Sequence, residues 1–186
     1  MQKSLVITHG AGSNSSTPLL VAIAEIFAGA GFHVLRCDLP FRQDRPTGPP
    51  LRSAERDREG LERAVQAMRE IVSGPLILGG HSYGGRQSSI LAAEKPGLAD
   101  TLLLLAYPLH PPRKPEQLRT QHFGRLRTPS LFVHGTRDPF GTIAEMQAAL
   151  AAIPARHELV TLENTGHELN AGAAALLRET LCFASV

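Results

Sequence analysis

The chain has 186 residues, of which 42% are hydrophobic and 19% are charged, and its formal net charge at pH 7 is +2. This composition is typical of one globular domain with a buried core, and it excludes a disordered chain and a uniformly basic nucleic-acid-binding surface. The longest apolar run, residues 102–106, cannot cross a bilayer, and the first ten residues lack the apolar core of a secretion signal. We therefore expect a cytoplasmic protein with no membrane or nucleic-acid partner.

Short apolar runs alternate with helical patterns along the first half of the chain. A helix is expected after Thr17, a residue suited to the N-cap, with Pro18 at the first helical position. In chain order we predict a strand at Ser4–Thr8, a helix at Leu19–Ala28, a strand at Phe32–Cys37, a Pro- and Arg-rich loop at Asp38–Leu51, a helix at Ser53–Val72, a strand at Leu76–Leu78 and a helix at Gly84–Lys95.

The second half continues the alternation. We predict a strand at Thr101–Ala106, a polar connection at Tyr107–Thr128, a strand at Ser130–His134, a helix at Ile143–Ile153, a strand at Glu158–Leu162 and a closing helix at Ala171–Phe183. Strands with continuous apolar cores that alternate with helices are typical of a parallel sheet covered on both faces. The expected fold class is α/β, with about six mostly parallel strands in a single domain, 1–186. The connection after the fourth strand has only about twenty residues, too few for a cap domain.

The two cysteines, Cys37 and Cys182, lie far apart and form no CxxC motif. A chain of this size does not need a disulfide to fold, so we expect two reduced thiols. No cluster of cysteine and histidine has the spacing of a metal site. We expect neither a metal nor a cofactor.

Residues 80–84, Gly-His-Ser-Tyr-Gly, match the pattern G-x-S-x-G. Small residues flank the serine of such a pattern because a tight turn from strand to helix leaves no space for side chains there. The match follows an apolar strand and opens a helical segment, as this turn requires. Ser82 is therefore the candidate nucleophile; the alternative is a glycine-rich turn with an idle serine.

A serine nucleophile needs a base, and the base needs an acid that orients it. Asp138 and His167 each follow a predicted strand, and the order Ser82, Asp138, His167 is one known order of this triad. Three other acids fit less well. Asp38 precedes Ser82 in the chain, Glu163 lies too close to His167, and Asp100 precedes a strand, at the opposite edge of the sheet.

The oxyanion that forms in acyl transfer needs backbone N–H donors. We expect one from Tyr83, the residue after the nucleophile, and one from Ala11 in the glycine-rich loop after the first strand. A dinucleotide site is the alternative for this loop, but G-x-G-x-x-G spacing is missing. His9 and His81 flank the predicted site, where each serves as a packing or hydrogen-bonding neighbour or as part of a substrate rim.

The sequence resembles the α/β-hydrolase superfamily in four motifs: HGAG after the first strand, GHSYG at the elbow, HGTRD and TGH. The segment YPLH at residues 107–110 and the strand LFVHG resemble a narrower family of small lidless hydrolase-like proteins, which includes a testis-expressed protein and a scaffold subunit of a histone-acetyltransferase complex. Where that family has Arg and Met around the serine, this chain has His81 and Tyr83. The chain more distantly resembles dienelactone hydrolases, which use cysteine as nucleophile.

The resemblance implies a minimal α/β-hydrolase fold without a cap domain and a serine hydrolase acting on small carboxylic esters or thioesters. Because some members of the narrower family are scaffolds, a non-catalytic binding role on the same fold is the second hypothesis. A peptidase or a cofactor-free perhydrolase is the third, since the same triad supports those reactions.

Sixteen of the nineteen cations are arginines, and they are unevenly distributed. The segment Arg36–Arg58 has six arginines against four acids, and the segment Pro108–Thr128 has five cations against one acid. Both segments begin at carboxyl ends of predicted strands, the edge that carries Ser82. Solvated loop charge is the ordinary interpretation. The alternative is a basic substrate rim, with Arg86, Arg113 and Arg119 as candidate residues, that attracts anionic esters or an acidic partner.

Overall fold

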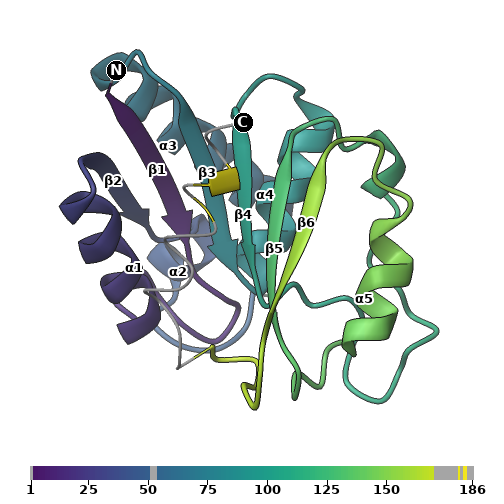
Figure 1. The fold of residues 1–186 in the computed structure, drawn as a ribbon. Coiled ribbons are helices and arrows are strands. Elements are labelled where there is room, and N and C mark those ends of the chain that lie inside the picture. The colour runs from purple at the N-terminus through teal and green to yellow at the C-terminus, as the bar shows by residue number, and fades with distance from the viewer. Residues whose placement is uncertain (1, 51–53, 170–179, 181, 184–186) are drawn as a thin grey trace.

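The computed structural model describes residues 2–50, 54–169, 180, 182 and 183. Six parallel strands form one sheet in the order β2-β1-β3-β4-β5-β6 (Figure 1). Their bounds are β1 (Lys3–Thr8), β2 (Phe32–Cys37), β3 (Leu76–His81), β4 (Thr101–Leu105), β5 (Ser130–Gly135) and β6 (His157–Leu162). The chain begins at β1, adds β2 at one edge, crosses back to β3 on the other side of β1 and then adds β4, β5 and β6 in turn. Because all the strands are parallel, their carboxyl ends lie along one edge of the sheet.

Helices cover both faces of this sheet. They are α1 (Pro18–Gly29), α2 (Pro40–Asp44), α3 (Ala54–Ile71), α4 (Tyr83–Glu94) and α5 (Ile143–Leu150), with a 3₁₀ turn, η1 (Phe123–Arg125). Alternate strand residues face opposite sides: Leu5 and Ile7 pack with α1, whereas Val6 packs in the cluster that includes α3, α4 and α5. Both faces are buried, which explains the continuous apolar runs of the strands.

All six predicted strands are confirmed, and so is the parallel α/β class. The prediction of a loop throughout residues 38–51 is wrong at α2, where Pro40 begins a helix of five residues. One and a half turns are too short for a hydrophobic period to be visible. Helix α5 ends at Leu150 rather than at Ile153. The predicted closing helix at 171–183 lies mostly outside the described residues.

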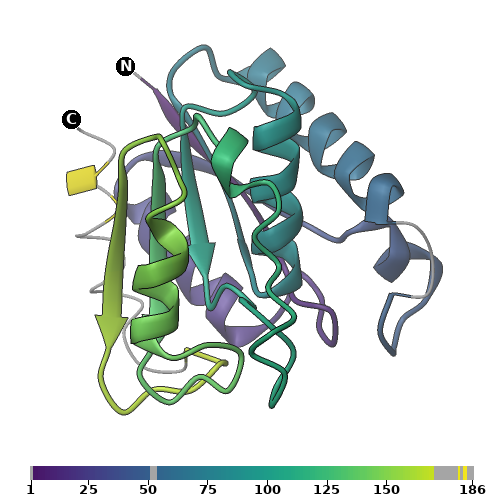
Figure 2. The same ribbon diagram turned by 90° about the vertical axis from the view of Figure 1, so that its right-hand side faces the viewer.

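No cap domain is inserted within the described ranges. The connection between β4 and β5 contains only η1 and extends past the carboxyl ends of the strands (Figure 2). The carboxyl edge of the sheet is therefore left without a covering domain there. Among the described helices, none combines the length and the apolar character needed to cross a membrane.

Candidate active site

Ser82 occupies a strained turn between β3 and α4. Its backbone angles are φ 51° and ψ −116°, which residues other than glycine rarely adopt. Its N–H donates to the carbonyl of Leu105 at 2.8 Å, which ties the turn to β4. Gly80 and Gly84 make the turn possible, because a Cβ on Gly80 would lie 2.6 Å from the Gly84 carbonyl carbon and one on Gly84 would collide with the His9 carbonyl oxygen. The turn holds Ser82 at the carboxyl edge.

The loops after β5 and β6 touch each other through their backbones. The N–H of Thr136 donates to Leu162 O at 3.0 Å, and the N–H of Arg137 donates to Thr165 O at 2.9 Å. Gly135 lacks a side chain where the Thr165 carbonyl passes, so the two loops can approach this closely. Residues that follow these strands, far apart in sequence, are thereby brought next to each other.

The structure brings Ser82, Asp138 and His167 together in a hydrogen-bonded chain. Nε2 of His167 lies 2.8 Å from Oγ of Ser82, and Nδ1 lies 2.8 Å from Oδ2 of Asp138. Since a carboxylate only accepts, Nδ1 carries the proton and Nε2 is left to accept from the hydroxyl. The Asp138 side chain is completely shielded from solvent, whereas His167 remains partly exposed. This is the arrangement by which an imidazole can remove a proton from serine.

Two contacts to Phe140 support the imidazole and the carboxylate. The Phe140 ring lies against the His167 ring with centroids 4.2 Å apart. The Phe140 N–H donates to Oδ1 of Asp138 at 2.9 Å, which occupies the carboxylate oxygen that does not face His167. A residue held by both partners fixes their relative orientation. Phe140 is not predicted as a site residue, because it has no motif of its own.

Backbone donors for an oxyanion are available on both sides of Ser82. Tyr83 is the first residue of α4, so its N–H has no intrahelical acceptor. On the other side, the Gly10 carbonyl faces Nδ1 of His9 at 2.8 Å and accepts from Ser13 N at 3.2 Å. In a trans peptide the N–H points opposite to the carbonyl, so the Ala11 N–H points away from these partners. These contacts leave the N–H groups of Tyr83 and Ala11 as the candidate donors, and their role in binding an oxyanion stays a prediction.

The buried side chain of Arg42 fixes the loop that contains Ala11. Its guanidinium donates to the carbonyls of Ala11 at 2.9 Å, Ser13 at 2.7 Å, Arg45 at 3.0 Å and Gly48 at 2.9 Å. Only 5% of Arg42 is exposed. One side chain thus satisfies carbonyls of two loops. The sequence contained no signal for this role, because Arg42 is one of several arginines in a loop-like, Pro-rich stretch.

A buried carboxylate anchors the Tyr83 side chain. Asp57 is 2% exposed and accepts from the Tyr83 hydroxyl at 2.8 Å and from the Phe41 N–H at 3.0 Å. Burial and this contact raise the pKa of Tyr83. Asp57 is not among the predicted site residues, although the sequence contains a signal for it. Asp57 lies four residues before Leu61 and eight before Val65, on the apolar stripe of α3.

The two histidines predicted for the substrate rim have different positions. His9 is fully buried, its Nε2 accepts from the Leu39 N–H at 3.1 Å and burial lowers its pKa. The rim prediction is wrong for His9, because the side chain is buried and its two ring nitrogens lie against backbone groups of Gly10 and Leu39. His81 is 7% exposed, and its Nε2 donates to the His167 carbonyl at 2.8 Å. Burial also lowers the pKa of His81, so the neutral ring is favoured.

The three candidate rim arginines also differ. Arg113 is exposed and has a left-handed φ of 62°, on the connection after β4. Arg86 and Arg119 are half-buried, and burial, with the charge of Arg86 as a second cause, lowers the pKa of Arg119. Arg86 and Arg119 are therefore partly withdrawn from solvent, whereas Arg113 is exposed.

Two of the three acids that fitted the triad less well, Asp100 and Asp38, have other contacts. Asp100 accepts from the Leu76 N–H and from Arg69, each at 2.8 Å, at the amino edge of the sheet. Asp38 accepts from the Ser15 N–H at 2.6 Å. Within the described part of the chain, no three residues of the metal-binding types form a metal site. Both cysteines are free, and burial raises the pKa of Cys37 to about 11.

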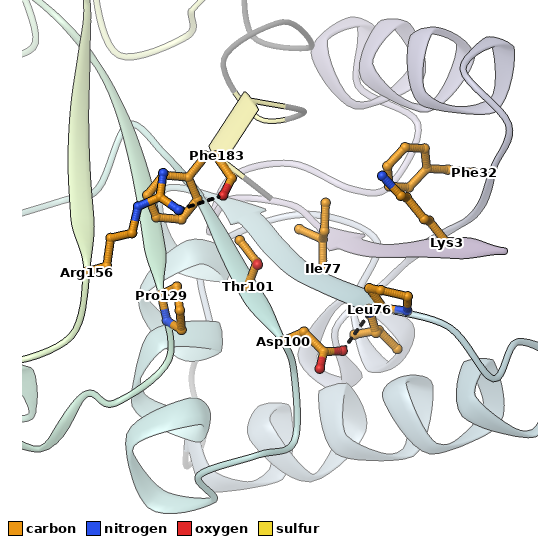
Figure 3. A pocket seen from close by; sticks show the side chains of 10 residues that line it. Lys3, Phe32, Leu76, Ile77, Asp100, Thr101, Pro129, Arg156 and Phe183 are labelled. Carbon is orange, nitrogen blue, oxygen red and sulfur yellow. Dashed lines mark hydrogen bonds between the residues drawn. The ribbon is translucent and has the colours of Figure 1, made fainter. Parts of the chain in front are cut away.

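A cavity of about 280 Å³ lies at the other end of the sheet (Figure 3). Its lining includes Lys3, Leu76 and Thr101, the first residues of β1, β3 and β4. Arg156 borders it and donates to the Phe183 carbonyl at 3.1 Å, as the dashed line in Figure 3 marks. Because these residues begin the strands that end near Ser82, this cavity is separate from the candidate active site.

Comparison with known proteins gives the family. Residues 1–176 match a family described as an alpha/beta hydrolase domain. Est1E from Butyrivibrio proteoclasticus, solved with ferulic acid, is similar at 16% identity and a TM-score of 0.80, over 98% of this chain and 90% of that one. A dienelactone hydrolase from Anabaena variabilis is similar at 20% identity and 0.76, over 98% and 84%.

A third solved structure, described for the metagenome-derived lipolytic enzymes LipS and LipT, is similar at 16% identity and a TM-score of 0.78. The match covers 99% of this chain and 94% of that chain. At such identities the likeness establishes the fold, while the family match spans nearly the whole chain. The parallel sheet, the elbow at Ser82 and the family match agree: the chain belongs to the alpha/beta hydrolase domain family.

Proposed function

We propose that the protein is a serine hydrolase that cleaves small carboxylic esters or thioesters through an acyl-enzyme intermediate. The observation that carries the proposal is the continuous hydrogen-bonded chain from the Ser82 hydroxyl through His167 to the buried Asp138. Esterase and lipolytic enzymes among the structural neighbours support a hydrolase that acts on small molecules. A cytoplasmic location and a single domain over the whole chain remain predictions.

The first half of the reaction acylates the serine. Oγ of Ser82 attacks the substrate carbonyl carbon while its proton moves to Nε2 of His167, and the carbonyl oxygen becomes an anion that the N–H groups of Tyr83 and Ala11 stabilise. Asp138 keeps the imidazole in the tautomer that can accept this proton and stabilises the imidazolium. The carbon–oxygen or carbon–sulfur bond then breaks, and His167 returns the proton to the leaving alcohol or thiol.

The second half releases the acid. Water attacks the acyl carbon, its proton moves to His167, and collapse of the tetrahedral intermediate returns a proton to Oγ of Ser82. Side chains and backbone of this chain supply every proton transfer and every charge contact, so the proposed reaction needs no cofactor. Because no cap covers the described carboxyl edge, we expect small, accessible substrates and broad selection.

The test measures hydrolysis of p-nitrophenyl acetate, p-nitrophenyl butyrate and a butyryl thioester. We expect Ser82→Ala and His167→Ala to lower kcat by about 10³-fold or more and Asp138→Asn to lower it by about 10⁴-fold. Ser73→Ala, which alters an exposed serine, is the matched control and should keep wild-type activity. Equal activity in wild type and Ser82→Ala would refute the proposal and favour the non-catalytic binding role.

A further inference from the structure

Arg86 lies one helical turn after the candidate nucleophile. Its backbone N–H donates to the carbonyl of Ser82 at 3.0 Å, so the two residues are on the same side of α4. Side chains on a helix lean toward its N-terminus. The guanidinium of Arg86 is therefore directed back toward the end of the helix that carries Ser82.

The connection after β4 is held against α4 beside Arg86. The Tyr107 hydroxyl donates to the Arg119 carbonyl at 2.6 Å. Further along the same connection, Nε2 of His122 lies 2.8 Å from Oγ of Ser89, which donates to the Arg86 carbonyl at 2.9 Å. The Tyr107 ring is fully buried and packs against Phe123, with centroids 5.3 Å apart. This residue follows β4 directly, so it holds the connection after β4 against the first turns of α4. Arg86, in the first turns of α4, and Arg119, on the connection, both belong to this junction, and burial together with the charge of Arg86 lowers the pKa of Arg119.

The charges of these two arginines are not neutralised by the described residues. Neither forms an ion pair there, whereas Arg58 pairs with Glu94 at 3.0 Å. The Nε of Arg86 is buried and has no hydrogen-bond partner in the described part of the chain. Buried polar groups nearly always have partners, and two neighbouring like charges in a partly buried place are unfavourable. An anion bound there would satisfy the donor and balance the charge.

Guanidinium groups fit carboxylates well, because their planar N–H donors match the two oxygens. The leaving group of a substrate must lie near His167, which comes from the loop after β6. Arg86 and Arg119 come instead from α4 and from the connection after β4. An anion between them would thus belong to the part of the substrate that stays on Ser82.

We propose that Arg86 and Arg119 form a carboxylate subsite, and that the preferred substrates are half-esters or half-thioesters of dicarboxylic acids, with the free carboxylate on the acyl part. This inference rests on the proposed function of Ser82 and names its substrate class. Exposed Arg113, on the same connection, does not belong to the subsite.

The kinetic test compares p-nitrophenyl hemiglutarate with p-nitrophenyl pentanoate, which have acyl chains of equal length and differ in the carboxylate. The quantity measured is the ratio of kcat/KM for the anionic ester to that for the neutral ester. We expect Arg86→Gln and Arg119→Gln each to lower this ratio by about 10- to 100-fold, as loss of charged hydrogen bonds does. Arg127→Gln removes an exposed charge from the same connection and should leave the ratio within about twofold.

An unchanged ratio in both variants, or an equal fall in Arg127→Gln, would overturn the subsite. If hydrolysis of the neutral pentanoate is lost in Ser82→Ala, the proposed function stands and only the subsite fails. If Ser82→Ala still hydrolyses the pentanoate as the wild type does, the proposed function itself fails. A binding measurement avoids catalysis altogether: glutarate should raise the melting temperature of Ser82→Ala, at constant ionic strength, and the rise should vanish when Arg86→Gln and Arg119→Gln are added. Stronger stabilisation by inorganic phosphate than by glutarate would overturn the carboxylate assignment.

Discussion

Nε2 of His81 lies 2.8 Å from the carbonyl oxygen of His167, so the residue before the candidate nucleophile holds the loop that carries the candidate base. The two rings are also neighbours, with centroids 5.2 Å apart. Because His81 belongs to β3, the hydrogen bond anchors the His167 loop to the sheet. His81 is therefore a positioning residue for His167.

Removing this donor should lower kcat more than it raises KM. We expect His81→Phe to reduce kcat by about 10- to 100-fold, since small displacements of a catalytic group have effects of this size. His81→Gln places an amide N–H near the position of Nε2 and should restore most of the activity. The measurement is steady-state hydrolysis of p-nitrophenyl butyrate. Equal losses in His81→Phe and His81→Gln would show that the ring, rather than the donor, matters.

The strained backbone of Ser82 makes a prediction about stability. Glycine adopts φ 51° and ψ −116° without the strain that other residues suffer, which is about 1–3 kcal/mol. Part of this gain is lost because glycine has more freedom in the unfolded chain. Ser82→Gly should therefore be more stable than Ser82→Ala by about 1 kcal/mol, or about 2–4 °C in melting temperature.

The control for Ser82 is the exposed Ser73, whose φ is not positive. At that position glycine should be no more stable than alanine. Thermal unfolding of the four variants gives the comparison. If Ser82→Gly melts at or below the temperature of Ser82→Ala, the turn does not store strain.

The loop that contains Ala11 depends on the carbonyl contacts of Arg42. Arg42→Met should lower kcat by about 10- to 100-fold, because the loop loses the donors that place it and an oxyanion donor is then misdirected. The free energy of unfolding should also fall, by about 2 kcal/mol or more, since buried carbonyls lose partners. Arg63→Met, at an exposed position, is the control. A loss of stability with wild-type kcat would limit Arg42 to a role in folding.

Much of the fold and of the site could be predicted from the sequence because the relevant signals are local. Continuous apolar runs in the strands indicate burial on both faces, and the glycines around Ser82 indicate the tight turn. The contacts that could not be predicted are long-range. Arg42 contacts Ala11, 31 residues away, and His81 contacts His167, 86 residues away. A local pattern carries no information about such contacts, so the sequence indicates neither the role of Arg42 nor the partner of His81.

The buried His122 predicts how stability depends on pH. Burial, together with the charges of Arg86 and Arg125, lowers the pKa of His122 to about 4. In the unfolded chain the imidazole has its ordinary pKa of about 6.5, so between pH 6.5 and pH 4 the unfolded state binds more protons. The contribution of His122 is therefore fully present above pH 6.5 and is lost as the pH falls toward 4, by at most about 1.4 kcal/mol per pH unit.

Urea unfolding at a series of pH values tests this dependence. His122→Gln should show a smaller loss of stability than the wild type between pH 7.5 and pH 4.5. His33→Gln, at an exposed position, should follow the wild-type curve. Parallel curves for the wild type and His122→Gln would show that His122 does not contribute to the pH dependence.

The nucleophilic role of Ser82 is the central claim, and covalent labelling tests it most directly. The protein is treated with a fluorophosphonate, and the adduct is located by mass spectrometry. The tryptic peptide 70–86 contains both Ser73 and Ser82, so fragmentation must distinguish them. We predict one adduct, on Ser82, that is absent from Ser82→Ala and slow to form in His167→Ala. An adduct on another residue, or equal labelling of Ser82→Ala, would contradict the claim.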